Sequence, residues 1–94
     1  MQFVWDPEKE KANINKHGLD FSVAALIFND PDRIEMYDYF HSDLEDRYIT
    51  IGSIGGVAIV VMVVYTERSN AIRIISARPA TKREKEAYYG SKTN

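Results

Sequence analysis

The chain has 94 residues, 45% of them hydrophobic and 28% charged, which is the composition of one globular domain and not of a disordered segment. It contains no cysteine, which excludes disulfide frameworks, zinc sites built on thiolates and thiol nucleophiles. The formal charge of −2 argues against a strongly basic nucleic-acid binder. The charge is unevenly distributed, because residues 1–72 carry 6 Lys and Arg against 12 Asp and Glu, whereas residues 73–94 carry 6 Lys and Arg against 2 Asp and Glu. We therefore expect an anionic ligand at the C-terminal end.

The first part of the chain predicts a short strand followed by two helices. Phe3–Trp5 is apolar and forms the strand. The run Asp6-Pro7-Glu8 then provides a capping side chain, a proline at the first helical position and an acid near the positive helix end. This helix ends where Gly18 can adopt the left-handed conformation. A second helix begins at Asp20 or Ser22 and ends near residue 30, with apolar side chains at helical spacing.

The middle of the chain changes to a period of two, which is typical of strands. We expect strands over residues 34–38, 48–51, 57–66 and 72–77, with turns at 52–56 and 67–70. Val57–Thr66 is apolar on both faces, which indicates a central strand covered on both sides. Its apolar part is about half the length of a membrane-spanning helix, and the N-terminus lacks a signal-peptide pattern. We therefore expect a soluble, cytoplasmic protein without membrane contacts.

The end of the chain predicts a third helix. Thr81 and Glu84 have the spacing of a capping box, and the helix they open ends near Gly90. The complete order is β-α-α-β-β-β-β-α. It predicts a single α+β domain, residues 1–94, in which two N-terminal helices and a C-terminal helix pack on a mainly antiparallel sheet.

A basic set near the C-terminus points to single-stranded RNA. Guanidinium groups bind phosphate oxygens and tyrosine rings stack on unpaired bases. Arg73 and Arg78 are an odd number of positions apart, so they share a face only if Arg78 lies beyond the end of its strand. The alternative interpretation is a solvated helix whose glutamates offset its lysines. The set comprises Arg73, Arg78, Lys82, Arg83, Tyr88 and Tyr89.

Two further sites are open to interpretation. His17 follows Lys16 at a helix end, where it is either a cap favoured by the helix dipole or an acid, base or phosphate contact. The loop around His41 carries four acidic side chains that together with it would suit a metal ion (Asp38, Asp43, Glu45 and Asp46). This loop lacks the regular spacing of a calcium loop, so we interpret it as a solvated acidic loop and predict no metal or cofactor.

Six short motifs, in order from residue 3 to about residue 89, resemble the BrnT toxin family. They are Trp5-Asp6-Pro7-Glu8-Lys9, Asn13-x-x-Lys16-His17-Gly18-x-x-Phe21, Phe28-x-Asp30-Pro31, Glu45-Asp46-Arg47-Tyr48, Val63-Val64-Tyr65-Thr66-Glu67-Arg68 and Arg73-Ile74-Ile75-Ser76-Ala77-Arg78. The resemblance implies a bacterial type II toxin with a RelE-like ribonuclease fold that cleaves RNA without a metal and arrests growth. It also implies a BrnA-type antitoxin that neutralises the toxin, binding of operator DNA only through the antitoxin complex, and a homodimer or a 2:2 complex.

The resemblance also implies functional residues. The family's basic positions fall on Lys16, His17, Arg47, Arg73 and Arg78, and its C-terminal tyrosine on Tyr88 or Tyr89. Of these we assign phosphate binding to Arg73 and Arg78, proton transfer to His17 or to Glu45 if it points inward, and RNA contacts to the remainder together with Lys82 and Arg83. A rival hypothesis is a catalytically weak binding module that acts as a corepressor. Catalysis requires Arg73, Arg78 and His17 to converge in one concavity, and a scaffold does not.

Overall fold

The computed structural model of the chain describes residues 1–55 and 59–92, so the predicted turn at Gly56 and the beginning of the predicted strand at Val57 lie outside the described residues. The elements follow the predicted order. They are β1 (Gln2–Val4), α1 (Pro7–His17), α2 (Phe21–Ala24), the 3₁₀ helix η1 (Ala25–Asn29), β2 (Ile34–Tyr37), β3 (Tyr48–Ser53), β4 (Val60–Arg68), β5 (Ala71–Pro79) and α3 (Lys82–Lys92). In the described part of the chain, no helix is long and apolar enough to cross a membrane.

The helix ends form as the sequence predicts. Asp6 accepts a hydrogen bond from the Glu8 amide at 2.9 Å, and Gly18 ends α1 with φ 69°. The Thr81 and Glu84 pair forms a reciprocal capping box, with distances of 3.2 and 2.8 Å. The second helix differs from the prediction, because it changes after Ala24 from an α-helix into a 3₁₀ helix.

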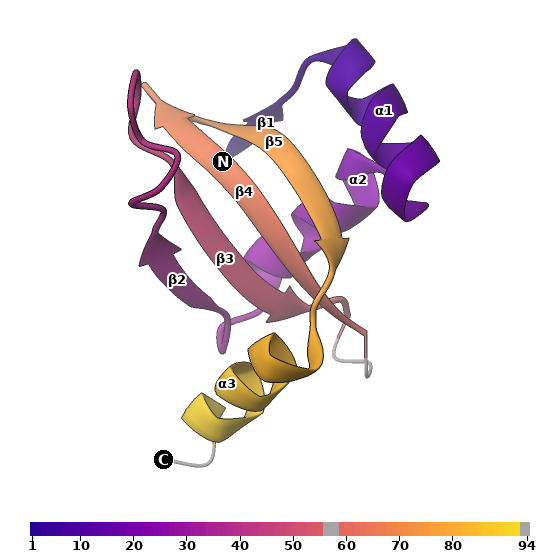
Figure 1. Cartoon of the computed structure of the whole chain (residues 1–94), viewed down its shortest axis with the longest axis vertical. Helices are drawn as coiled ribbons and strands as arrows, with labels where there is room; N and C mark the ends of the chain where they lie inside the picture. Colours follow the sequence, from indigo (N-terminus) through magenta and orange to yellow (C-terminus); the bar gives the residue numbers. More distant parts are fainter. Residues whose placement is uncertain (56–58, 93–94) are drawn as a thin grey trace.

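The five strands form one sheet in the order β1-β5-β4-β3-β2. β1 pairs with β5 in parallel, and the other neighbours are antiparallel. Figure 1 shows α2 behind this sheet, α1 beside the edge formed by β5, and α3 across the opposite end. The mainly antiparallel α+β architecture predicted from the sequence is therefore confirmed.

The two faces of the sheet are covered unequally. Against one face, α2 and η1 pack the larger core, which contains Phe21, Ile27, Phe28, Val61, Val63, Tyr65, Ile72, Ile74 and Ala77. Against the other face, α3 covers one end only, where Tyr88 packs with Ile51, Val60 and Met62. The rest of this second face, in front in Figure 1, is not covered by α3. Two hollows are lined by its residues.

Tyr88 fixes α3 to the sheet. Its side chain is 1% exposed, and its hydroxyl donates a hydrogen bond of 2.5 Å to Asp30 Oδ2. The same carboxylate accepts bonds from the Ser53 amide at 2.9 Å and the Ser53 hydroxyl at 3.2 Å. Burial raises the pKa of Asp30, but these hydrogen bonds outweigh it and the pKa is lowered. Asp30 thus joins β3 to the C-terminal helix as a carboxylate.

Candidate active site on the open face of the sheet

A β-bulge places Arg73 and Arg78 on the same face of the sheet. Arg78 pairs with Met62 and Arg73 with Thr66, and these partners are four residues apart on β4 and therefore point the same way. The parity changes because the register shifts between Val64 and Tyr65. The strand end predicted at residue 77 is wrong, since β5 continues to Pro79, and the two arginines share a face although Arg78 lies within the strand.

Two adjoining hollows form a groove across the open face. Each encloses about 390 Å³, and they share Met62, Ile75, Ser76 and Arg78 as lining. The first hollow is bounded by α1, through Lys9, Ala12, Asn13, Lys16 and His17. The second is bounded by the β2–β3 loop and β3, through Asp38, Phe40, His41, Arg47 and Ile49. We call the two hollows together the groove.

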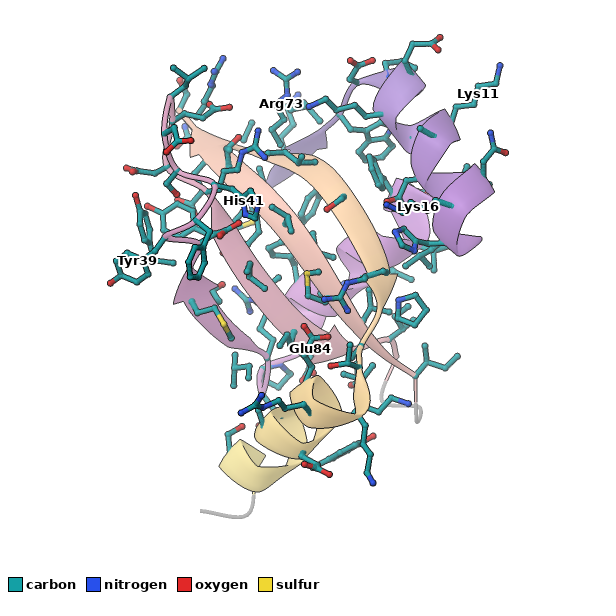
Figure 2. All side chains as sticks on the ribbon, in the orientation of Figure 1. Lys11, Lys16, Tyr39, His41, Arg73 and Glu84 are labelled. Carbon is teal, nitrogen blue, oxygen red and sulfur yellow. The ribbon has the colours of Figure 1, made fainter. Side chains whose placement is uncertain are left out.

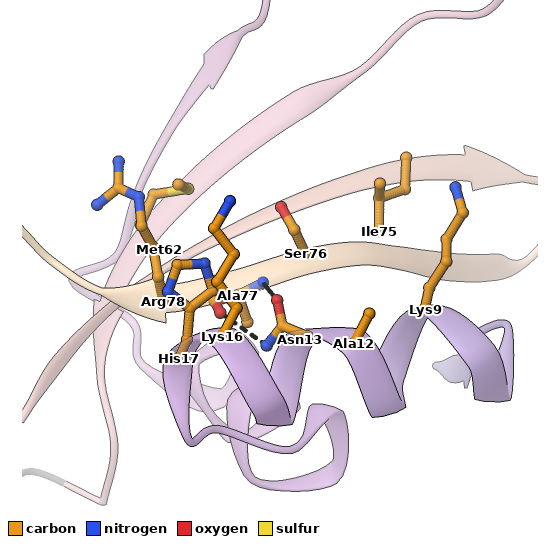
Figure 3. A pocket seen from close by; sticks show the side chains of 10 residues that line it. All are labelled: Lys9, Ala12, Asn13, Lys16, His17, Met62, Ile75, Ser76, Ala77 and Arg78. Carbon is orange, nitrogen blue, oxygen red and sulfur yellow. Dashed lines mark hydrogen bonds between the residues drawn. The ribbon is translucent and has the colours of Figure 1, made fainter.

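Asn13 attaches α1 to the sheet beside the groove. Its Nδ2 donates to the carbonyl oxygen of Ala77 at 2.8 Å and to that of Leu19 at 2.9 Å, and its Oδ1 accepts from the Ala77 amide at 3.1 Å (Figure 3). β1 pairs with β5 only as far as Arg73, so the side-chain amide of Asn13 replaces the next strand at this edge. Asn13 was not among the predicted site residues, because a lone asparagine within a helix carries no distinctive signal.

The attachment of α1 brings its last turn over the groove. Figure 3 shows Lys16 and His17 extending from this turn toward β5, beside Arg78. Lys9 lies two turns earlier on the same side of the helix and lines the same hollow. In contrast, Lys11 points away from the sheet in Figure 2. One side of a largely polar helix therefore adds positive charge to the groove.

Arg78 is oriented by a bidentate ion pair. Its Nη1 and Nη2 donate to the two carboxylate oxygens of Glu84 at 2.8 and 3.0 Å, and Nη1 also donates to the carbonyl of Pro79 at 3.2 Å. The bonds from Arg78, reinforced by the Thr81 amide, lower the pKa of Glu84 against the opposing effect of burial. A guanidinium has five N–H donors, so the edge formed by Nε and Nη2 is left to bind an anion in the groove.

Arg47 lies at the other side of the groove. Among the described residues, no carboxylate lies within ion-pair distance of Arg47, and its buried Nε has no hydrogen-bond partner. An unpaired guanidinium beside a groove is a strong binding group for a phosphate.

The remaining predicted residues are distributed unevenly. Arg73 shares the face of Arg78 but does not line the groove, because the offset of four positions between their partners on β4 corresponds to about 13 Å. The expected convergence of Arg73, Arg78 and His17 in one concavity is therefore met by Arg78 and His17 and not by Arg73. Glu45 points to Arg68, with an Oε2–Nη2 distance of 2.8 Å, and so is not a free base. Tyr88 is buried, which corrects its assignment as a stacking platform, whereas Tyr89 is 43% exposed. Lys82 and Arg83 are exposed on the first turn of α3, outside the groove.

The acidic loop does not assemble a cluster of metal ligands. Within the described ranges, no group of three or more His, Cys, Asp or Glu side chains is placed to hold one ion. Asp46 accepts a hydrogen bond from the Tyr37 hydroxyl at 2.8 Å, and Asp38 contacts His41 through both carboxylate oxygens. The loop does carry two residues of the groove that the sequence analysis did not assign to RNA, His41 and the 89% exposed Phe40.

A small α+β protein with a groove lined by arginine, lysine and histidine on an open sheet face has the chemistry of a protein that handles a phosphodiester backbone. The comparison with protein families agrees. The family model described as "Ribonuclease toxin, BrnT, of type II toxin-antitoxin system" matches residues 5–84, so the chain belongs to this family of ribonuclease toxins and has an antitoxin as its partner. No curated protein matches the chain.

Proposed function

We propose that the chain is a metal-independent endoribonuclease that binds single-stranded RNA in the groove, cleaves it there and thereby arrests growth. One observation carries the proposal. The lining of the groove contains four Lys and Arg side chains and two histidines, with Asp38 as its one carboxylate, in a chain whose net charge is −2. Positive charge is concentrated where the protein surface is hollowed, and this favours binding of a phosphodiester chain.

The proposed cleavage uses the RNA's own 2′-hydroxyl as the nucleophile. Attack on the adjacent phosphorus needs cations for the charge that develops on the phosphate and a group that moves a proton. Arg78, with Lys16 on one side and Arg47 on the other, binds the phosphate. His17 is a proton carrier, since its imidazole lines the groove with Lys16 and Arg78. The cationic residues outside the groove contact RNA on either side of the cleaved bond, and so does Tyr89. These cationic residues are Arg73, Lys82 and Arg83.

The test is cleavage of a mixed-sequence single-stranded RNA by the purified chain in the presence of EDTA. We expect products that end in a 2′,3′-cyclic phosphate. Lys16→Ala lowers the rate by about tenfold or more, because a hydrogen bond to a charged group contributes about 1.5–3 kcal/mol. Lys11→Ala is the matched control on the same helix and leaves the rate unchanged. Loss of cleavage in EDTA, or equal effects of both variants, would contradict the proposal.

We also propose that the antitoxin is of the BrnA type and that it neutralises the chain by binding to it. The complex is a 2:2 assembly or is built around a homodimer of the chain, and operator DNA is bound only by this complex. Family membership supports the presence of an antitoxin, and the exposed edge strand β2 offers a site for pairing. Expression of the chain alone arrests growth, and co-expression of the antitoxin restores it. A folded chain that binds the antitoxin and operator without cleaving RNA would instead be the binding module.

A further inference from the structure

His41 is held in a fixed orientation by Asp38. The imidazole Nδ1 lies 3.0 and 3.1 Å from the two carboxylate oxygens of Asp38, a residue that is only 7% exposed. The backbone of Asp38 is itself anchored, since its amide donates to the Arg47 carbonyl at 2.9 Å and its carbonyl accepts from the Ser42 hydroxyl at 2.6 Å. The carboxylate therefore orients the ring from a rigid position.

This contact determines which nitrogen of His41 is free. A carboxylate accepts hydrogen bonds, so the neutral ring carries its proton on Nδ1 and presents an unprotonated Nε2 on its opposite side. The His41 side chain is 67% exposed, and Figure 2 shows it extending from the β2–β3 loop over the sheet. It lines the groove with Arg47 and Arg78. A histidine that is oriented by a carboxylate and lines the site with its other nitrogen unbound is the arrangement of a general base.

The loop does not depend on the His41 ring for its shape. Ser42 Oγ accepts a bond from the Arg47 amide at 2.9 Å while it donates to the carbonyl of Asp38, and these contacts close the loop without the imidazole. The exposed ring also contributes little to the core. The ring is therefore the partner of the buried Asp38 carboxylate, but it is not needed to close the loop.

We infer that His41 is the general base of the RNA cleavage and that His17, across Arg78, is the general acid; this assignment rests on the proposed ribonuclease function. Nε2 of His41 takes the proton of the RNA 2′-hydroxyl while the oxygen of that hydroxyl forms a bond to phosphorus. The bond between phosphorus and the 5′-oxygen breaks, and protonated His17 transfers its proton to that oxygen. The products are a 2′,3′-cyclic phosphate and a 5′-hydroxyl, and no other reactant is needed. Asp38 is a positioning residue.

The first test compares His41→Ala and Asp38→Asn with Leu44→Ala, a control on the same loop whose side chain is fully exposed and lies outside the groove. His41→Ala lowers the cleavage rate by about 10²–10⁴-fold, the contribution of a general base. Asp38→Asn lowers the maximal cleavage rate and leaves RNA binding unchanged. A loss of loop structure would instead reduce both the rate and RNA binding. Because His41→Ala removes the hydrogen-bond partner of the buried Asp38 carboxylate, we expect it to lower the free energy of unfolding, and cleavage is therefore compared under conditions in which urea unfolding shows each variant to be folded.

The second test separates the base from the acid. An RNA with sulfur in place of the bridging 5′-oxygen at a mapped cleavage site has a leaving group that needs no proton. On this substrate His17→Ala recovers to near the parental rate, whereas His41→Ala stays slow. Recovery of His41→Ala, or parental activity of that variant on ordinary RNA, overturns the assignment and leaves the proposed ribonuclease intact. A parent chain that cleaves no RNA overturns both.

Discussion

Replacing Asn13 by alanine tests how α1 is attached to the sheet. The substitution removes three hydrogen bonds and leaves the amide and carbonyl of the fully buried Ala77 without their partner. Each unsatisfied buried group costs about 1–3 kcal/mol. Alanine recovers about 0.5 kcal/mol through its higher helix propensity. We therefore expect Asn13→Ala to lower the free energy of unfolding by about 1.5–5.5 kcal/mol, a large part of the stability of a small domain.

The measurement is equilibrium unfolding in urea, with Asn15→Ala as the matched control. Asn15 lies on the same helix, is exposed, and makes no side-chain hydrogen bond to a described residue, so the same substitution there is neutral or slightly stabilising. We expect the midpoint to fall for Asn13→Ala with an unchanged slope. If the two variants differ by less than about 0.5 kcal/mol, within the range of ordinary surface substitutions, the strand-like role of Asn13 is wrong.

Two further predictions concern Asp30 and the β2–β3 loop. Because the pKa of Asp30 is lowered in the fold, its carboxylate stabilises the protein above its ordinary pKa of 3.8, and this contribution is lost as the pH falls through the lowered value. The difference in unfolding free energy between the parent chain and Asp30→Asn is therefore larger at pH 7 than at pH 3. An equal difference at the two pH values would refute this. Phe40→Ala weakens binding of single-stranded RNA by about 1–3 kcal/mol if the ring stacks on a base, as measured by fluorescence anisotropy, whereas Leu44→Ala does not.

The order of elements was predictable because each boundary has a local chemical signal. Asp6, Gly18 and Thr81 act on backbone groups within a few residues of themselves, so the sequence contains the whole interaction. The bulge on β5 has no such signal. It depends on which residue of β4 faces which residue of β5, and this long-range register decided whether Arg73 and Arg78 share a face.

The candidate site was predictable only in part, for the same reason. Lys16, His17, Arg47 and Arg78 were proposed from residue type and family motifs, and the fold places all four beside the groove. Tyr88 has the sequence appearance of an exposed aromatic residue, but its hydroxyl satisfies Asp30 from 58 positions away. Conversely, the sequence predicted Asp38 and His41 to belong to a solvated acidic loop, with a metal site as the alternative, because it does not show that one carboxylate orients one imidazole beside the groove.

The acidic net charge of the chain is compatible with RNA binding because the carboxylates nearest the cations are engaged by them. Glu84 occupies the end of the Arg78 guanidinium formed by Nη1 and Nη2 and leaves the edge formed by Nε and Nη2 unoccupied, and Asp38 is engaged by His41. Glu45 neutralises Arg68, a residue outside the groove. Interactions between exposed charges are screened beyond about 10 Å at 0.1 M salt, so a bound phosphate responds mainly to the local lining and not to the total charge. If the chain binds RNA as proposed, we expect its affinity to depend on the few cations of the groove, and we expect the acidic remainder of the surface to face a partner of opposite charge.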